Sequence, residues 1–461
     1  MKIFNTLTRQ VDEFIPNNPG KVLIYTCGPT VYSYAHIGNM RNYVGHDILD
    51  KTLRYIGYDV KRCMNITDVG HLTSDSDSGE DKMLKAVRKE GKTAMEIAKF
   101  YTDAFFKDFD LLNLKRPEIV SNATDNIDEY IKIISKLIEK GYAYSSGGNI
   151  YFDTTKLDDY YVLTNHKEDE MVVGVREGVE EDQNKKNQND FVLWFTTSKF
   201  ENHELQWDSP FGRGYPGWHI ECSGISIKYL GEYLDIHGGG VDNIFPHHTN
   251  EIAQSEGYLG HKWCNYWFHN EHLLDETGKM SKSAGAILTV SKLKEEGYNP
   301  LSYRFMCLNS HYRKQLVFSY DALKQSEDTL SKLKNRIKNI VDDNNYNEEH
   351  FNKYNDEFKK NLEDDLNTAN AITVLYDVLK SDIGNSTKLK LIESFDKVLS
   401  LDLLKNEEVS LDSEILNRIE ERNIAKKNKD FALADSIRDE LLEQGIRLID
   451  SREGTTYEIV K

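Results

Sequence analysis

The sequence comprises 461 residues, of which 39% are hydrophobic and 29% are charged, and its formal net charge is −18. This length allows several domains, and no apolar run approaches the roughly 18 residues that a membrane-spanning helix needs. The negative charge argues against indiscriminate nucleic-acid binding, and five widely spaced cysteines form no disulfide framework. The first residues also lack the charged-then-apolar layout of a secretory signal. We therefore expect a multidomain, monomeric cytoplasmic protein that binds neither membranes nor DNA.

The first unit along the chain is predicted to be a β-strand, a helix and a second β-strand. Residues 21–27 form a short apolar run that ends at a Gly-Pro pair, which indicates a buried strand. Apolar residues recur at helical spacing between 37 and 56, and Gly57 ends that helix. Residues 59–67 are predicted to form the second strand. Parallel strands joined by a helix predict an open, doubly wound sheet with ligands at the carboxyl ends of its strands.

The next part of the chain departs from this α/β pattern. Residues 73–81 are acidic, and we interpret them as a solvated loop because their spacing does not match a calcium-binding loop. Residues 93–145 are predicted to be largely helical. The polar stretch 175–190 shows no periodicity and is predicted to be an exposed loop within an insertion.

The α/β pattern then resumes and indicates the second half of a split sheet. The expected elements are a helix at 218–231, a strand at 232–240, a helix at 246–260 and a strand at 265–270. Pro246 is expected at the first position of the second helix and Gly260 just after its end. After about residue 315 the chain is predicted to be helical and rich in lysine, with a compact closing unit.

The segment His36-Ile37-Gly38-Asn39 lies where the loop after the first strand enters the helix. Free backbone N–H groups and the positive end of the helix dipole favour anions at such a point. Gly38 lets a flat ligand approach the backbone, and His36 can donate a hydrogen bond to phosphate. On these residues alone, a loop histidine without a ligand remains an alternative.

A second segment, Lys279-Met280-Ser281-Lys282-Ser283, follows an expected strand. Two lysines three residues apart between small residues suit the spread charge of a polyphosphate. Lysine runs are usually solvated surface, but this five-residue string is more specific. Its occurrence after the first segment, across a split nucleotide-type fold, favours a shared phosphate site.

Four dispersed residues also suggest a metal site. His247 and Glu251 are four residues apart and share one face of the predicted helix. Cys27 ends the first strand, and Cys222 lies in the helix of the second half. Two thiolates, an imidazole and a carboxylate suit zinc. The thiols are far apart in sequence, so spacing alone leaves buried, inert cysteines as the alternative.

The two lysine- and histidine-containing segments resemble the HIGH and KMSKS elements of class I aminoacyl-tRNA synthetases. Further segments are similar to the cysteinyl members of that class. They are residues 2–10 (KIFNTLTRQ), 25–32 (YTCGPTVY), 65–68 (NITD), 216–223 (PGWHIECS), 235–240 (DIHGGG), 245–248 (FPHH) and 454–456 (GTT). The resemblance runs closely from residue 2 to about 320 and returns near the C-terminus.

The resemblance implies the following roles. One zinc ion per subunit is held by Cys27, Cys222, His247 and Glu251, with His248 packed beside it. The residues around bound cysteine are Gly28, Thr67, Trp218 and His237. ATP, with magnesium, contacts His36, Gly38, Asn39, Gly239, Asp242 and Lys282, and the catalytic residues are His36, Asn39, Lys279 and Lys282. The chain departs from the family at Asn39, where histidine is usual, because asparagine can donate a hydrogen bond but carries no charge.

A zinc ion has a chemical reason to be in such a site. Cysteine and serine are nearly isosteric, and a hydrophobic pocket separates such pairs poorly. A zinc ion with a vacant position binds a thiolate directly, whereas the serine hydroxyl is harder to deprotonate. Selectivity of about 10⁴–10⁵ corresponds to roughly 5.5–7 kcal/mol, which one metal–sulfur bond can supply without an editing domain.

The C-terminal segment resembles the anticodon-reading module of the family. A basic stretch precedes an amphipathic helix, although basic helix starts are often plain surface. Cations hold tRNA phosphates while hydrogen bonds and stacking read unpaired bases. The expected tRNA-binding residues are Arg422, Lys426, Lys427, Arg438 and Asp450.

We therefore expect an α/β protein with a Rossmann-like, doubly wound parallel sheet split by an insertion, then a helical bundle and a small anticodon-binding domain. The expected boundaries are 1–115 and 205–285 for the catalytic halves, 116–204 for the insertion, 286–317 for a linker fold, 318–405 for the bundle and 406–461 for the last unit. The resemblance implies a ligase that activates cysteine with ATP and esterifies tRNA(Cys). One alternative is a cysteine ligase of mycothiol-type synthesis, which would need no anticodon module. Another is a non-catalytic, zinc-stabilised RNA-binding paralogue.

Overall fold

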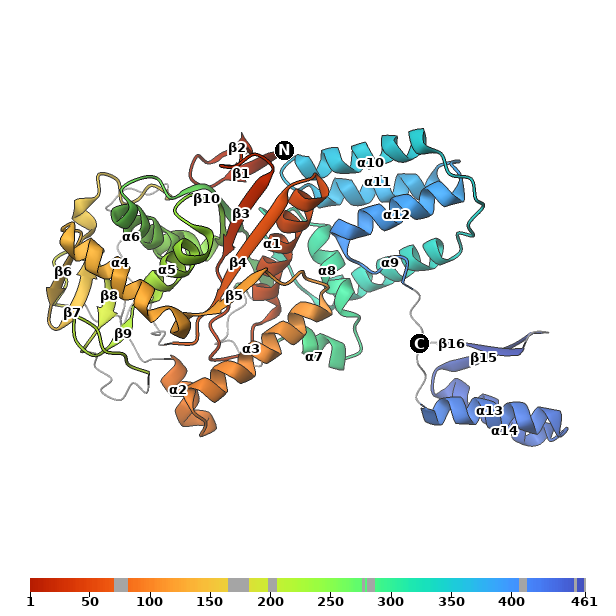
Figure 1. The fold of residues 1–461 in the computed structure, drawn as a ribbon. Coiled ribbons are helices and arrows are strands. Elements are labelled where there is room, and N and C mark those ends of the chain that lie inside the picture. Colours follow the sequence, from red (N-terminus) through yellow and green to blue (C-terminus); the bar gives the residue numbers. More distant parts are fainter. Residues whose placement is uncertain are drawn as a thin grey trace. The chain divides into compact units, whose positions relative to one another are not determined.

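The computed structural model describes residues 1–69, 82–164, 182–197, 205–275, 278–279, 287–405, 413–451 and 454–459. Contacts within the chain divide it into two compact units, Met1–Leu404 and Lys405–Lys461 (Figure 1). The acidic segment 73–81 and Lys282 lie outside the described residues, as does the first part of the polar stretch 175–190. Of Lys279, the structure describes the backbone only.

Five parallel strands form the central sheet of the first unit, in the order β11–β10–β3–β4–β5 (Figure 1). Their bounds are β3 (Lys21–Thr26), β4 (Asp59–Ile66), β5 (Ile119–Asn122), β10 (Leu234–Gly240) and β11 (Cys264–Asn270). The chain adds strands on one side of β3 and then on the other, so the sheet is doubly wound. Its switch point lies between β3 and β10, where this architecture binds ligands. The expected fold class is confirmed.

Both faces of this sheet are covered by helices, and alternate side chains of β3 pack into two different apolar cores. Val22 and Ile24 belong to the core that includes α1 (Ile37–Tyr55). Tyr25 and the partly buried Leu23 pack in the core on the α5 side (α5, Trp218–Leu230). Successive side chains of a strand point to opposite faces, so each face receives its own apolar set. Further helices of this region are α2 (Lys82–Glu90), α3 (Ala94–Leu111) and α6 (Thr249–Leu259).

Between the two halves of the sheet, the chain builds a second, antiparallel sheet. Its strands, in spatial order, are β6 (Ala143–Ser146), β7 (Asn149–Phe152), β8 (Phe191–Phe195) and β9 (Tyr215–Pro216), preceded by α4 (Ile127–Glu139). Gly147 and Gly148 form the turn between β6 and β7, with φ of 55° and 92°. Two successive residues with positive φ are what a tight hairpin turn requires, and glycine adopts them without strain.

The rest of the first unit is mainly helical. It contains α7 (Val290–Glu295), α8 (Pro300–Leu308), α9 (Tyr320–Lys338), α10 (Glu348–Glu363), α11 (Thr368–Lys380) and α12 (Asn385–Leu399). Short strands β12 (Leu273–Asp275), β13 (Gly278–Lys279) and β14 (Leu316–Val317) precede the bundle, and the N-terminal hairpin is β1 (Lys2–Asn5) with β2 (Gln10–Glu13).

One buried arginine ties the end of the bundle to helix α1, which packs on the central sheet. Arg304 of α8 lies 2.7 Å from Asp47 of α1, and both side chains are fully buried. The same guanidinium donates to the carbonyl oxygens of Leu112, Val398 and Leu399. A buried charge is tolerated only when it is paired and hydrogen-bonded. These contacts therefore fix α8, α1 and the end of α12 to one another.

The second unit is a helical hairpin followed by a β-hairpin. Its elements are α13 (Ser413–Lys427), α14 (Phe431–Glu443), β15 (Ile446–Ser451) and β16 (Gly454–Ile459). A small apolar cluster holds them together, with Ile419, Ile437, Leu441 and Ile446 at its centre.

Local periodicity located β3, α1 and β4 to within one residue, but other elements differ from expectation. The segment 93–145 contains two strands, β5 and β6, besides its helices. β5 lies within the range expected for the insertion yet pairs with β4 of the central sheet. The helix expected from Pro246 begins at Thr249, because residues 244–248 form a separate turn in which Phe245 is extended. Among the described residues, no helix is both long and apolar enough to cross a membrane.

Candidate active site and metal centre

A pocket opens at the switch point of the central sheet. Its walls come from the loop after β3, the start of α1, the ends of β4 and β10, the start of α5 and the residues after β11. The predicted site residues in its lining are Cys27, Gly28, His36, Gly38, Asn39, Thr67, Trp218 and Asp242. Gly239 and His237 precede the lining residue Gly240 on β10.

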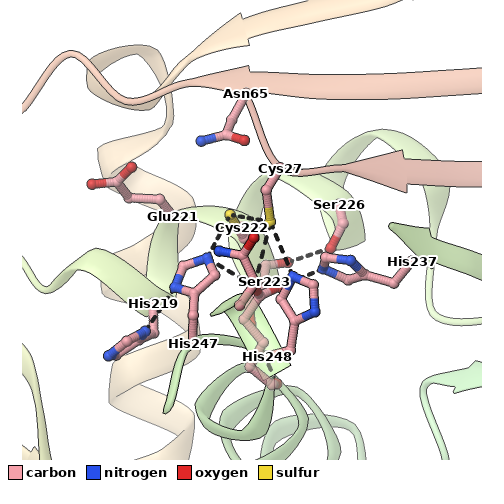
Figure 2. A network of polar contacts seen from close by, with 12 residues as sticks. Cys27, Asn65, His219, Glu221, Cys222, Ser223, Ser226, His237, His247 and His248 are labelled. Carbon is pink, nitrogen blue, oxygen red and sulfur yellow. Dashed lines mark hydrogen bonds and ion pairs between the residues drawn. The ribbon is translucent and has the colours of Figure 1, made fainter. Parts of the chain in front are cut away.

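Four predicted metal ligands converge beside this pocket, and one of them, Cys27, lines it. Figure 2 shows three of them, Cys27, Cys222 and His247, close together. Cys27 Sγ lies 3.9 Å from Cys222 Sγ and 3.9 Å from Glu251 Oε1. His247 Nε2 lies 3.5 Å from Cys222 Sγ and 3.0 Å from Glu251 Oε1. The four atoms come from the end of β3, from α5, from the turn before α6 and from α6. Only the tertiary fold brings these thiols together.

The two separations that involve Cys222 fit a tetrahedral zinc ion. Zinc–ligand bonds of about 2.3 Å to sulfur and about 2.0–2.1 Å to nitrogen place two sulfurs about 3.8 Å apart and a sulfur and a nitrogen about 3.5 Å apart. Cys27 and Cys222 are 3.9 Å apart, and Cys222 and His247 are 3.5 Å apart. Two thiols with one imidazole and one carboxyl group are donors that zinc prefers. The residues therefore fit a zinc ion.

Burial controls the charge of this cluster. It raises the pKa of Cys222 well above the ordinary thiol value and also raises the pKa of Cys27. It raises the pKa of Glu251 to about 8 and lowers that of His247 to about 3. Desolvation disfavours every charged form in this dry site. A divalent cation among these groups would stabilise the thiolate and carboxylate forms, which are unfavourable when they are buried without a cation.

Further imidazoles surround the four convergent side chains. His237 Nε2 lies 2.8 Å from Glu251 Oε2, and His248 Nε2 lies 3.3 Å from Cys27 Sγ. Cys27, His237, His248 and Glu251 form an alternative group of possible ligands. The set with two thiols matches zinc chemistry better, and hydrogen bonds from neighbouring imidazoles are usual around a metal ligand. We therefore retain Cys27, Cys222, His247 and Glu251 as the predicted ligands, with His248 beside them.

Two aromatic contacts shape the pocket above the cluster. The Trp218 ring stacks on the His247 ring, with centroids 4.1 Å apart and an angle of 27° between the planes. His219 Nδ1 also lies 2.9 Å from His247 Nδ1. Trp218 therefore contacts both the pocket and a candidate ligand, rather than only the core.

The start of α1 explains the role of Asn39. The backbone N–H of Asn39 donates to His36 Nδ1, and Asn39 Oδ1 accepts from the backbone N–H of His36, both at 3.2 Å. This reciprocal pair is a capping box, which satisfies two backbone donors of the first turn. Asn39 thus organises the end of the helix that faces the pocket. Because His36 Nδ1 accepts a hydrogen bond, the hydrogen of its neutral ring is on Nε2.

Several polar residues of the site were not found from the sequence. Glu221 and His219 lie in an apolar stretch of α5 and are fully or almost fully buried, at 0% and 1% exposed. Asn65 lines the pocket at the end of β4. Buried polar side chains inside an otherwise apolar segment are the signal that could have marked them.

The expected tRNA-binding residues lie in the second unit. Arg422 is buried and pairs with both oxygens of Asp450 at 2.8 Å, and Lys426 Nζ lies 2.9 Å from the same carboxylate. The hydrogen bonds from Arg422 and, to a smaller extent, from Lys426 lower the pKa of Asp450. Any base contact by Asp450 would compete with these ion pairs. Lys427 is exposed, as is Arg438, which pairs with neighbouring aspartates of α14.

Comparison with known families agrees with this fold and site. Residues 13–328 match the family described as the class I (C) tRNA synthetase catalytic domain, and residues 357–401 match the DALR domain. A solved methionyl-tRNA synthetase from Mycobacterium tuberculosis, in complex with methionyl-adenylate, shares the fold at a TM-score of 0.58 and 14% identity. That likeness covers 83% of this chain and 91% of the solved one. The fold and the matched catalytic domain define a class I aminoacyl-tRNA synthetase.

Curated relatives identify the family within that class. A protein of Treponema denticola named cysteine–tRNA ligase is 47% identical, with 99% of each chain covered. A protein of Borrelia garinii subsp. bavariensis with the same name is 43% identical, over 99% of this chain and 98% of the relative. The chain belongs to the family of cysteine–tRNA ligases.

Proposed function

We propose that this chain uses MgATP to activate cysteine as cysteinyl-adenylate and then transfers cysteine to the 3′-terminal adenosine of tRNA(Cys). In this proposal one zinc ion, held by Cys27, Cys222, His247 and Glu251, selects the substrate by its thiol. The observation that carries the proposal is the convergence of these four donors beside a pocket that is lined by Cys27 and by the start of α1. Membership in the cysteine–tRNA ligases supports the same reaction.

The thiol end of the substrate belongs at the floor of the pocket. A zinc ion bound there would supply a coordination position for a thiolate, which a serine hydroxyl fills poorly. Cys27 and Trp218 both line the pocket, so a ligand in it can reach the metal position while contacting the indole ring. This arrangement supports selection by chemistry rather than by size alone.

The phosphate end of ATP belongs near the start of α1. The helix has 19 residues, and its first backbone N–H groups and positive dipole end favour anions. His36, Gly38 and Asn39 line this wall, and Asp242 lines the wall after β10. We assign the ribose to Asp242 and the phosphates to His36 and the first turn of α1. Lys279 and Lys282 are proposed from the resemblance to complete the phosphate site.

The activation step needs no general base from the protein. An oxygen of the substrate carboxylate, already ionised at neutral pH, attacks the α-phosphorus of ATP as the bond to the leaving pyrophosphate breaks. His36 can donate from Nε2 to phosphate oxygen, and the two lysines can stabilise the charge that develops. In the second step a terminal hydroxyl of tRNA attacks the carbonyl carbon, and AMP leaves.

Exchange of radioactive pyrophosphate into ATP tests the proposal. The purified zinc-loaded protein is assayed with each of the twenty amino acids, and its zinc content is measured alongside. Cysteine alone should support rapid exchange, with about one zinc per chain as expected for a single set of ligands. Rapid exchange with a different amino acid, or none with cysteine in a zinc-loaded preparation, would contradict the proposed function.

A further inference from the structure

A chain of hydrogen bonds runs from the backbone beside Cys27 to a buried carboxyl group on α5. The backbone N–H of Gly28 donates to Asn65 Oδ1 at 2.8 Å, and Asn65 Nδ2 donates to Thr67 Oγ1 at 3.0 Å. The Thr67 hydroxyl donates to Glu221 Oε2 at 2.8 Å. Gly28, Asn65 and Thr67 line the pocket, whereas Glu221 lies behind them and is not exposed. The zinc-site proposal assigns Glu221 no role.

The direction of this chain follows from its first donor. A backbone N–H can only donate, so Asn65 turns its carbonyl oxygen toward Gly28 and its NH₂ group toward Thr67. An amide NH₂ also only donates, so Thr67 Oγ1 accepts from it. The hydrogen of the Thr67 hydroxyl then points to the carboxyl oxygen of Glu221. The orientation of the Asn65 amide is therefore fixed, and the Thr67 hydroxyl donates to Glu221 Oε2.

In this arrangement the Thr67 hydroxyl is left to act as a hydrogen-bond acceptor toward a ligand. A hydroxyl has one hydrogen and two lone pairs. Glu221 takes the hydrogen, and Asn65 is the donor to one lone pair. The Thr67 backbone is also fixed, because its N–H donates to Pro29 O and its carbonyl accepts from Val31 N–H, both at 3.1 Å. What Thr67 offers a ligand in the pocket is therefore an acceptor.

We propose that Glu221 is a positioning residue for amino-acid binding: it holds the Thr67 hydroxyl hydrogen away from the pocket, so that Thr67 accepts a hydrogen bond from the substrate's α-ammonium group. This inference rests on the proposed function, because it takes the ligand to be cysteine with its thiol at the metal. Among the described residues, the second carboxyl oxygen, Glu221 Oε1, has no hydrogen-bond partner. The Glu221 carboxyl group is thus buried with a single hydrogen bond within the described part of the chain, the one from Thr67.

Two fragments of cysteine test whether the Thr67 hydroxyl accepts a hydrogen bond from the substrate's ammonium group or donates one to its carboxylate. Cysteamine keeps the amine and lacks the carboxylate, and 3-mercaptopropionate keeps the carboxylate and lacks the amine. Both keep the thiol, so metal binding is common to both. Calorimetry measures their dissociation constants for the zinc-loaded full chain without ATP, which makes the readout independent of catalysis.

The first variant removes the hydroxyl while keeping the shape of the side chain. Thr67→Val should raise the dissociation constant of cysteamine about 10- to 100-fold, the usual worth of a hydrogen bond to a charged group, and change that of 3-mercaptopropionate less than about threefold. Thr67→Ser, which keeps the hydroxyl, is the matched control. If Thr67→Val instead weakened only 3-mercaptopropionate, or changed both equally, Thr67 would not be an ammonium acceptor and the proposal would be overturned.

The second pair of variants tests Glu221 itself. Glu221→Gln can still turn an oxygen toward Thr67, so it should keep the wild-type ratio of the two dissociation constants within about threefold. Glu221→Leu releases the hydroxyl hydrogen, so cysteamine should lose about tenfold in affinity relative to 3-mercaptopropionate while zinc content stays at the wild-type value. An unchanged ratio in a zinc-loaded Glu221→Leu protein would overturn the proposal, and if that variant does not fold, the Thr67→Val comparison decides. A wild-type protein that binds neither thiol would refute the proposed function, whereas normal thiol binding with unaltered ratios in the variants would refute this inference alone.

Discussion

Replacing Cys222 by serine should remove the metal from the site and leave the fold intact. The Cys222 sulfur is buried, 3.9 Å from Cys27 Sγ and 3.5 Å from His247 Nε2, so it supplies one of two thiol positions in the cluster. Serine is smaller and nearly isosteric, so the surrounding side chains need not move. Its hydroxyl remains protonated near neutral pH and is a poor zinc ligand.

The size of the effect follows from the selectivity that the site must supply. Discrimination of about 10⁴–10⁵ between cysteine and serine corresponds to about 5.5–7 kcal/mol of transition-state binding. If the contact between the substrate thiolate and the metal supplies this energy, Cys222→Ser should lose about that factor in kcat/KM for cysteine. Its rates with cysteine and serine should then converge to within about tenfold, because only size remains to separate them.

Pyrophosphate exchange with cysteine and with serine, together with elemental analysis for zinc, measures both consequences in one preparation. Cys264→Ser is the matched control, since Cys264 is also buried but lies outside the cluster, with its sulfur 3.4 Å from the carbonyl oxygen of Tyr266. The control should keep zinc and activity. A zinc-free Cys222→Ser protein that still preferred cysteine over serine by several orders of magnitude would refute the reasoning.

Four further substitutions and one truncation have defined outcomes. Lys282→Ala should lower kcat for activation far more than it raises KM for ATP in steady-state exchange kinetics, because a transition-state contact acts mainly on kcat; a change in KM alone would make this lysine a ground-state binder. Asn39→His should keep activity within about threefold, since imidazole can also cap a helix, whereas Asn39→Ala should lower the free energy of unfolding by about 1 kcal/mol in urea titrations. Arg304→Met should cost about 3–5 kcal/mol in the same titrations, because it leaves the buried Asp47 with one cation fewer. Ending the chain after residue 405, where the compact first unit closes, should preserve cysteine-dependent exchange and sharply reduce tRNA charging; normal charging with intact rejection of a mutated anticodon would mean that the last unit is structural.

Parts of this molecule were predictable because their cause is local. The strand at 21–27 and the helix that follows are encoded by apolar spacing, and the structure has them as β3 (Lys21–Thr26) and α1 (Ile37–Tyr55). The short strand β5 (Ile119–Asn122) was missed because a strand of four residues carries too few positions to show a period. The helix after Pro246 was placed too early, since a proline at a helix start and a proline in the preceding turn leave the same local signal.

The sequence by itself determined the residue types of the site: two thiols, an imidazole and a carboxyl group that suit zinc, and a loop-to-helix segment that suits phosphate. It could not place Cys27 beside Cys222, because that contact depends on how helix α5 packs against strand β3 of the central sheet. Only the tertiary structure revealed Glu221, whose importance lies in its single contact with Thr67 and not in any pattern along the chain. The physical reason is that periodicity reports which face of an element is buried, whereas a hydrogen bond between distant segments is set by how those faces meet.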